Sequence, residues 1–263
     1  MKKVMQWALA AALLISGPTV FTSCSIDDNP VKRERKMMLV GREFTDMPYF
    51  GTTIDKYTYD DEYRLVNMKT VQVSTGEVLS NLDYIYTPGH ITKKGQNHVD
   101  EITDECRLDD QGRIVEYQNK CVNTETGKVL ADDIYTFTYD ENGHLATMHT
   151  ANAVETYTWE GDELRSSIMI ENNTGYLLET YEPSDAPAQT FFNWYGYKVP
   201  ELCLQGCFGV LPAHMPAKQS IVMYLSDTLN ISYDYEYKYT TVDGRLATVT
   251  VDQSNYILYW ELI

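Results

Sequence analysis

Residues 135–145 read YTFTYDENGHL, and this stretch decides the fold of the chain. Aromatic residues stand at every second position up to Tyr139, with threonines between them, and such a period of two is typical of a β-strand. Gly143 then stands where a tight hairpin requires a positive φ angle, and Asn142 before it tolerates such a turn. The stretch therefore predicts a strand that ends in a tight turn and returns antiparallel from Leu145.

Two kinds of turn recur along the chain. The first kind has Asp, usually Gly, and then Arg or His before an aliphatic residue, and it occurs at 59–65 (YDDEYRL), 108–114 (LDDQGRI), 139–145 and 241–246 (TVDGRL). The second kind has Thr-Gly, then one further residue and two aliphatic residues. It occurs at 74–79 (STGEVL), 125–130 (ETGKVL) and 173–178 (NTGYLL). Because the two kinds alternate, we expect them at opposite ends of one sheet.

The spacing of these turns predicts the architecture. Leu65 and Val78 are 13 residues apart and Ile114 and Val129 are 15 apart, which leaves strands of ~9–11 residues after a turn of ~3–4. About 13–16 strands fit between residues 39 and 263, where no helical periodicity stands out. An open sheet rarely exceeds ~10 strands without curling or splitting. The sequence thus predicts an all-β protein, an antiparallel up-and-down meander that is closed or curled into a barrel.

Residues 1–23 are predicted to be a lipoprotein signal peptide. Two lysines precede the apolar run VMQWALAAALLI at 4–15, and SGP at 16–18 ends it. The run is too short for the roughly 20 residues of a membrane-spanning helix. Small residues precede Cys24 in VFTSC at 20–24, which resembles a bacterial lipobox, whose cysteine is diacylated. The sequence therefore predicts lipidation at Cys24 and attachment to a lipid bilayer; the alternative is an ordinary signal peptide with a chance cysteine.

Residues 24–38 are predicted to be a lipidated tether. The acids in SIDD at 25–28 resemble the surface-export signal of Bacteroidota lipoproteins, and a plain solvated tether is the alternative. The chain carries 21 Lys and Arg against 38 Asp and Glu, a net charge of −17, and loss of Lys2 and Lys3 makes it −19. Such an acidic chain is not suited to neutralising phosphates, so no nucleic-acid partner is expected.

The turns also resemble those of known families. YDENGHL at 139–145 resembles the tyrosine-aspartate repeats of Rhs-type proteins. Over residues 39–263 the chain more closely resembles a Bacteroidota lipoprotein family of unknown function with a porin-like fold. This resemblance rests on the lipobox at Cys24, the two alternating kinds of turn and LPAHMPA at 211–217. This resemblance implies a porin-like barrel and no activity. It also implies an outer membrane-anchored lipoprotein that faces the periplasm or the cell surface.

The alternation stops between residues 183 and 220, a non-repeat insertion in the single barrel domain 39–263. It contains FFNWYGY at 191–197 and five of the nine prolines. A long insertion in a compact domain is usually functional or a structural cap. We therefore expect either an apolar plug for a barrel too wide to fill itself, or a ligand site in which Trp194, Tyr195 and Tyr197 stack on sugars.

Four cysteines remain besides Cys24. Pairing of Asp109 with Arg113 across the turn would place Cys106 opposite Glu116 and Cys121 opposite Glu101, on opposite faces of the sheet. A disulfide between them is then disfavoured unless a bulge intervenes. Cys203 and Cys207 are four residues apart, and the spacing suggests a disulfide between these two. Zinc would need two further ligands, of which His214 is the only near candidate, so we predict no metal site.

No catalytic constellation stands out. GxSxG, HExxH and phosphate-binding glycine loops are absent from the sequence, and no cofactor is predicted. The acidic pairs stand on turns or strand ends, where carboxylates bind backbone N–H groups. His144 fills a turn position that is Arg in the other three turns, so we expect it to be solvated.

Three function classes follow. The first is a non-enzymatic binding or scaffold module of the cell envelope with a glycan or an envelope protein as partner. The second is a secreted carbohydrate-active hydrolase with carboxylates on its hairpin turns. The third is an integral outer-membrane barrel, since ~9–11 residues is also the length of a membrane strand. Tyr in mid-strand and a second face rich in Thr, Asp, Glu and Lys argue against the third class.

Overall fold

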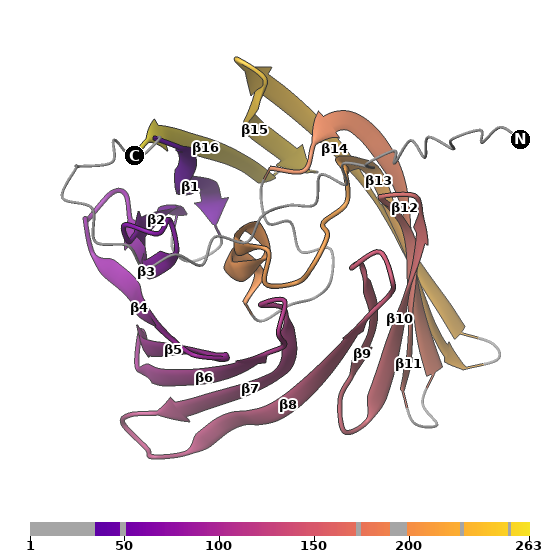
Figure 1. Cartoon of the computed structure of the whole chain (residues 1–263), viewed down its shortest axis with the longest axis horizontal. Coiled ribbons are helices and arrows are strands. Elements are labelled where there is room, and N and C mark those ends of the chain that lie inside the picture. The colour runs from indigo at the N-terminus through magenta and orange to yellow at the C-terminus, as the bar shows by residue number, and fades with distance from the viewer. Residues whose placement is uncertain (1–34, 48–50, 172–174, 190–198, 227–228, 252–253) are drawn as a thin grey trace, which may run out of the picture. The chain divides into compact units, whose positions relative to one another are not determined.

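The computed structural model describes residues 35–263 except for 48–50, 172–174, 190–198, 227–228 and 252–253. Residues 36–263 form one compact unit, a closed barrel in which each strand pairs antiparallel with its neighbours in the chain and β16 returns to pair with β1 (Figure 1). This confirms the predicted antiparallel meander and its closure. The sixteen described strands are β1 (Met37–Met47), β2 (Gly51–Tyr59), β3 (Leu65–Gln72), β4 (Val78–Thr87), β5 (His90–Asn97), β6 (Asp100–Leu108), β7 (Ile114–Asn123), β8 (Val129–Tyr139), β9 (Leu145–His149), β10 (Ala153–Glu160), β11 (Glu163–Glu171), β12 (Gly175–Pro187), β13 (His214–Ser226), β14 (Leu229–Val242), β15 (Arg245–Val251) and β16 (Ser254–Leu262).

Alternation sorts each strand into a lumen face and an outer face. On β10, Glu155 and Tyr157 are buried while Thr156 and Thr158 are exposed. The same period is clear over most of β2 and β4, where Tyr57 and Tyr84 are buried and Thr58 and Ile85 are exposed, so aromatic residues of the alternating stretches point inward. The core of this protein is therefore the inner wall of the barrel.

The first kind of turn is stabilised by its own aspartate. The Asp109 carboxylate accepts hydrogen bonds from the backbone N–H groups of Gln111 and Arg113, both at 2.9 Å, and Arg113 Nε donates to it at 2.8 Å. Partial burial raises the pKa of Asp109, but these donors outweigh it and hold the pKa below its usual value. Asp60 and Asp140 bind their own turns in the same way.

A β-bulge follows each turn of this kind, and the aliphatic residue after the turn is buried. The register shifts at Thr58/Tyr59, Arg107/Leu108, Thr138/Tyr139 and Thr240/Thr241. The carbonyl of the aliphatic residue then accepts a hydrogen bond from an aromatic side chain of a later strand. These bonds join Tyr86 Oη to Leu65 (3.0 Å), Tyr139 Oη to Ile114 (2.7 Å), Trp159 Nε1 to Leu145 (2.8 Å) and Trp260 Nε1 to Leu246 (2.8 Å). Aromatic residues thus tie neighbouring hairpins together.

The bulges correct the predicted position of two cysteines. Because of the shift at Arg107/Leu108, Cys106 lies opposite Tyr117 and Cys121 opposite Ile102, so both face the lumen side rather than opposite sides. They are four residues apart in register, about 13 Å at the rise of a β-strand, and both are free thiols. The prediction of opposite faces was wrong because a bulge moves every later residue to the other face.

Two boundaries also differ from those predicted. The barrel begins at Met37 rather than at residue 39, and Lys36 exchanges backbone hydrogen bonds with Ile263 at 3.1 and 3.0 Å. β12 extends to Pro187 and β13 begins at His214, so the stretch between these strands is residues 188–213 rather than 183–220. The strands here pair irregularly across Pro183 and Pro216, which the alternation pattern does not reveal. Among the residues described, no helix has the length and hydropathy of a membrane span.

Candidate functional site in the barrel lumen

We name residues 188–213 the plug segment; its described residues, 188–189 and 199–213, contact the inner wall of the barrel. Its only described helix is the 3₁₀ turn η1 (Pro200–Gln205), which lies in the middle of the ring of strands (Figure 1). Its backbone and side chains contact five hairpins in turn, all at the end with the Asp-containing turns. The hydrogen bonds are Leu246 N to Gln189 Oε1 (2.9 Å), Leu65 N to Gln205 Oε1 (3.3 Å), Ile114 N to Cys207 O (2.7 Å), Val210 N to Gly143 O (2.9 Å) and Ala213 N to Asp162 O (2.9 Å).

Apolar packing holds the plug segment from within. Leu202, Cys203 and Phe208 are buried, and the Phe208 ring meets the Phe137 ring of β8 edge-on at a centroid distance of 5.5 Å. Gly209 passes so close to the turn before β9 that a Cβ atom would lie 2.2 Å from the Gly143 carbonyl oxygen. The segment therefore lies so close to this turn that only a glycine fits at the contact.

A buried ionic cluster joins the plug segment to the wall. Lys93 Nζ of β5 lies 3.3 Å from both Asp104 Oδ2 of β6 and Glu201 Oε1 of η1, and Tyr84 Oη of β4 donates to Glu201 Oε1 at 2.5 Å. None of the three charged side chains is more than 7% exposed. Burial lowers the pKa of Lys93, but the charges of Glu201 and Asp104 outweigh it and raise the pKa above its usual value. Lys93 is therefore a cation that forms ion pairs with two buried carboxylates, one from the wall and one from the plug segment.

A second polar cluster lines β10 to β14. Gln219 Nε2 donates to Glu179 Oε2 at 2.9 Å, Tyr237 Oη donates to Gln219 Oε1 at 2.6 Å, and Tyr181 Oη also donates to Glu179. Nearby Glu155 is 6% exposed, and burial raises its pKa from 4.5 to about 7, helped by the charge of Glu179 and opposed by the hydroxyls of Ser167 and Tyr157. Near neutral pH this wall carries a carboxyl group that is half protonated.

The raised pKa of Glu155 makes stability depend on pH. Between pH 4.5 and about 7 the folded protein binds more protons than the unfolded chain, so stability falls as pH rises through this window. Glu155→Gln removes that loss and should be more stable than the wild type at pH 8, by at most about 3 kcal/mol at 1.36 kcal/mol per pKa unit. At pH 4 the two proteins should be closely similar. Urea unfolding at both pH values measures this.

The exposed outer-face residue Glu101 gives the control for that measurement. Glu101→Gln should leave the difference between pH 4 and pH 8 as it is in the wild type. An equal effect of Glu155→Gln at both pH values would contradict the assignment.

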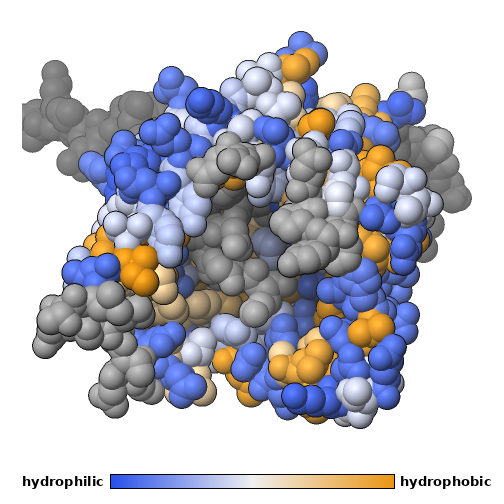
Figure 2. All heavy atoms as spheres, turned by 180° about the vertical axis from the view of Figure 1, so that it is seen from behind, coloured by the Kyte–Doolittle hydropathy of each residue, from blue (hydrophilic) through white to orange (hydrophobic). Residues whose placement is uncertain are grey.

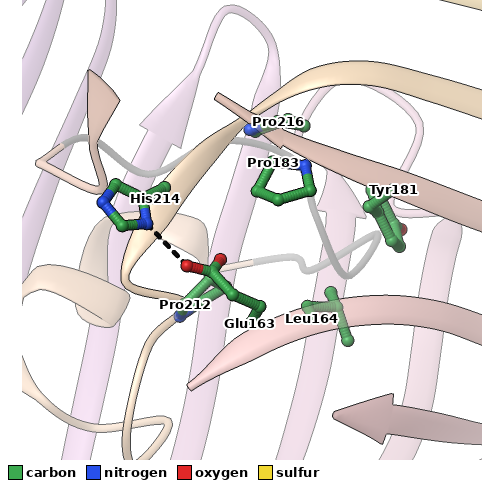
Figure 3. A pocket seen from close by; sticks show the side chains of 7 residues that line it. All are labelled: Glu163, Leu164, Tyr181, Pro183, Pro212, His214 and Pro216. Atoms are coloured by element: carbon green, nitrogen blue, oxygen red, sulfur yellow. Dashed lines mark hydrogen bonds and ion pairs between the residues drawn. The ribbon is translucent and has the colours of Figure 1, made fainter. Parts of the chain in front are cut away.

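A small pocket lies where β11 and β13 meet the end of the plug segment (Figure 3). It holds about 210 Å³ of empty space, part of it open to solvent, and His214 Nδ1 lies 2.5 Å from Glu163 Oε1 at its edge. Its lining is Glu163, Leu164, Tyr181, Pro183, Pro212, His214 and Pro216. His214 pairs with Glu163 rather than with the two cysteines of the plug segment. Within the described residues no group of three His, Cys, Asp or Glu side chains is placed to hold a metal ion.

The predicted site residues fall into two groups. Cys24, Trp194, Tyr195 and Tyr197 lie outside the described residues. Cys203 and Cys207 are described, both buried as free thiols, so the structure does not contain the disulfide that their spacing suggested. Burial raises the pKa of the Cys207 thiol to about 12, which makes it a poor nucleophile.

His144 is not the solvated turn residue that the sequence indicated. It is 2% exposed, lies between Asp140 Oδ2 and Asp162 Oδ1 at 3.1 Å from each, and stacks on the Trp159 ring at a centroid distance of 4.4 Å. The prediction was wrong because the plug segment covers this turn, with Val210 bridged to His144.

No protein-family model and no curated protein sequence matches the chain. Among solved structures, a porin-like protein from Bacteroides uniformis ATCC 8492 is 12% identical with a TM-score of 0.58, over 85% of this chain and 98% of that one. A porin-like protein from Bacteroides vulgatus ATCC 8482 is 13% identical with a TM-score of 0.61, over 86% of this chain and 99% of that one. At such identities the likeness shows a shared porin-like barrel fold.

Proposed function

We propose that the chain is a non-enzymatic binding or scaffold module of the outer membrane whose barrel stands in water and is held to the bilayer by lipid on Cys24. The observation that carries this proposal is the polar outer face. Outward positions on β5 to β8 include Lys94, Glu101, Glu105, Lys120 and Asp132, and Figure 2 shows many hydrophilic residues, with apolar ones between them, on the face that it draws. A membrane barrel needs an apolar band about 25 Å tall, and a charged residue at its centre costs about 2–4 kcal/mol.

The chain path supports an orientation for this module. β1 begins at Met37 paired with Leu262, and Tyr59 Oη bonds to Leu39 O at 2.7 Å, so the chain enters at the end with the Asp-containing turns, which the plug segment contacts. The segment from Cys24 to Lys36 spans at most about 40 Å. This end would then lie near the bilayer and the other end would point away.

The lumen is more accessible at that other end. On β14 the inward residues change from Tyr237, which is 8% exposed, to Tyr233, which is 48% exposed, and on β8 they change from buried Phe137 to exposed Asp133. A ligand would enter past these residues, which lie far from the plug contacts. This gives the binding module a mouth directed into the medium.

The mode of attachment is tested first by lipid labelling. Wild-type protein grown with a fatty-acid analogue should carry the label, and Cys24→Ala should not. A second measurement uses the chain that begins at Ser25, which contains all the described strands and should be soluble and folded without detergent. Label retained in Cys24→Ala would overturn the anchor, and a Ser25 chain that folds only in detergent would make the protein an integral barrel.

The turn carboxylates argue against a hydrolase. Asp60, Asp109 and Asp140 each accept backbone N–H groups of their own turn and pair with the Arg or His four residues on. A general acid or nucleophile has to face a substrate. Carboxylates that close a turn are engaged in structure, which supports a non-enzymatic role.

The partner of the module is proposed to be a glycan or an envelope protein that contacts the aromatic segment of Trp194. Screening first identifies a glycan or envelope protein that binds the Ser25 chain. Trp194→Ala should then lower the affinity for that partner at least about tenfold, which is about 1.4 kcal/mol of binding free energy. Tyr176→Ala, an exposed aromatic residue on the outer face of β12, is the control and should leave affinity unchanged. Equal affinity of the wild type and Trp194→Ala would remove this segment from the binding site.

A further inference from the structure

One strand of the barrel has an edge that its neighbour does not cover. β8 spans Val129–Tyr139 but pairs with the short strand β9 only from Thr136 to Tyr139. Residues 129–135 pair with β7 on one side, and among the described residues no backbone group bonds to their other side. Alternate N–H and C=O groups over these seven residues therefore point away from the sheet.

The uncovered edge follows from barrel closure. Closing a sheet into a barrel requires neighbouring strands to be staggered along their length. Here the two short hairpins β9–β10 and β15–β16 each cover only part of the longer strand before them. β14 is exposed in the same way, since it meets β15 only from Tyr237 onward. The turns beside that second edge include residues outside the described part of the chain, whereas both turns that flank β8 are described (Figure 1).

The side chains along this edge are open to solvent. Leu130 and Ile134 are 50% and 53% exposed on the outer face, and Asp132 between them is exposed. Asp133 is exposed on the lumen face. Natural sheets usually protect such edges with Lys, Pro or a covering loop, and residues 129–135 contain no Lys, Arg or Pro. The edge therefore offers main-chain hydrogen bonds, apolar contacts and two negative charges.

We propose that residues 129–135 of β8 bind an extended, basic segment of a partner protein by strand addition. Main-chain bonds supply affinity and alternate side chains supply specificity in this mode of recognition. Lys or Arg residues of the partner that lie beside Asp132 and Asp133 pair with these carboxylates, one on each face of the sheet. Seven residues also match the usual length of a strand. The surface borders the lumen mouth at Asp133, but the main-chain bonds of strand addition do not depend on what the lumen binds.

Charge also decides against a second copy of this chain. Two β8 edges that pair antiparallel would bring Asp132 and Asp133 of both copies together, and like charges on facing strands are destabilising. The chain itself is strongly acidic, with a net charge of −17. A basic partner is attracted by the same charges that repel another copy.

The test uses the Ser25 chain and a synthetic, capped nine-residue peptide of alternating Val, Thr and Lys. The peptide should bind and protect from hydrogen exchange those alternate amides of residues 130–135 that point away from β7. The double variant Asp132→Lys with Asp133→Lys should weaken binding at least tenfold, while Glu101→Lys should not. Glu101 gives a matched control because it is exposed on β6, a strand paired on both edges. A peptide N-methylated at alternate residues should lose binding.

Three results would overturn the proposal. The first is equal binding by a peptide with Glu in place of Lys, or by the N-methylated peptide. The second is protection of amides elsewhere with none at 130–135. The third is a dimer of the protein alone that protects 130–135, which would make the second copy the occupant of this edge. Circular dichroism of each variant checks that the barrel has folded.

Discussion

Replacing Lys93 by methionine should destabilise the barrel by about 3–5 kcal/mol, because the change leaves Asp104 and Glu201 buried without a cation. For a chain of this size such a loss lowers the melting temperature by about 10 °C. Lys93 lies on β5 and Glu201 in the plug segment, so the change affects both the wall and the plug. Thermal unfolding followed by circular dichroism at pH 7 measures it.

Two variants separate the cluster from a general effect of losing a lysine. Lys94 is next to Lys93 but exposed on the outer face, and Lys94→Met should change stability by less than about 0.5 kcal/mol. Adding Asp104→Asn and Glu201→Gln to Lys93→Met removes the unpaired charges and should restore most of the loss. A Lys93→Met protein as stable as the Lys94→Met protein would show that the cluster carries no such free energy.

Replacing Phe208 by alanine should cost about 3–5 kcal/mol, since it leaves a cavity beside Phe137 in fully buried surroundings. The loss should appear first in the docking of the plug segment. Hydrogen exchange should accelerate at the amides of Ile114 and Leu65, which donate to Cys207 and Gln205, before it accelerates elsewhere in the barrel. Hydrogen exchange read residue by residue checks this order.

The matched controls are a smaller change at the same site and a truncation at the edge of the segment. Phe208→Leu keeps most of the volume and should cost only about 1 kcal/mol. Val210 is 39% exposed, and Val210→Ala should cost less than about 0.5 kcal/mol. Uniform acceleration of exchange across all strands in Phe208→Ala would mean that plug and barrel unfold as one unit.

The sequence predicts the strands and their meander well, because turn chemistry and alternation are local properties. YTFTYDENGHL contains a strand, a turn and the first residue of the return strand, and β8 and β9 meet there. Long-range features are not visible in the same way. A single bulge at Arg107/Leu108 reverses the face of every later residue on that pair, which is why Cys121 was misplaced.

The lumen site could be predicted only in part. Lys93 stands two residues after buried Ile91, and Glu155 two before buried Tyr157, so alternation alone places both on the inner face. Their partners come from elsewhere: Glu201 reaches Lys93 from η1, more than 100 residues along the chain. His144 was misjudged for the same reason, since the residues that bury it belong to the plug segment and to later strands.

The contacts of the plug segment with five hairpins bear on the order in which the barrel folds. Closing the barrel joins Glu43 to Tyr259, a separation of 216 residues, and contacts of such high order slow folding. By the time residue 213 has been synthesised, four of the five hairpins that the segment binds are already present in the chain. We therefore expect the segment to hold these four hairpins together while only β13 to β16 remain to be added before β16 meets β1.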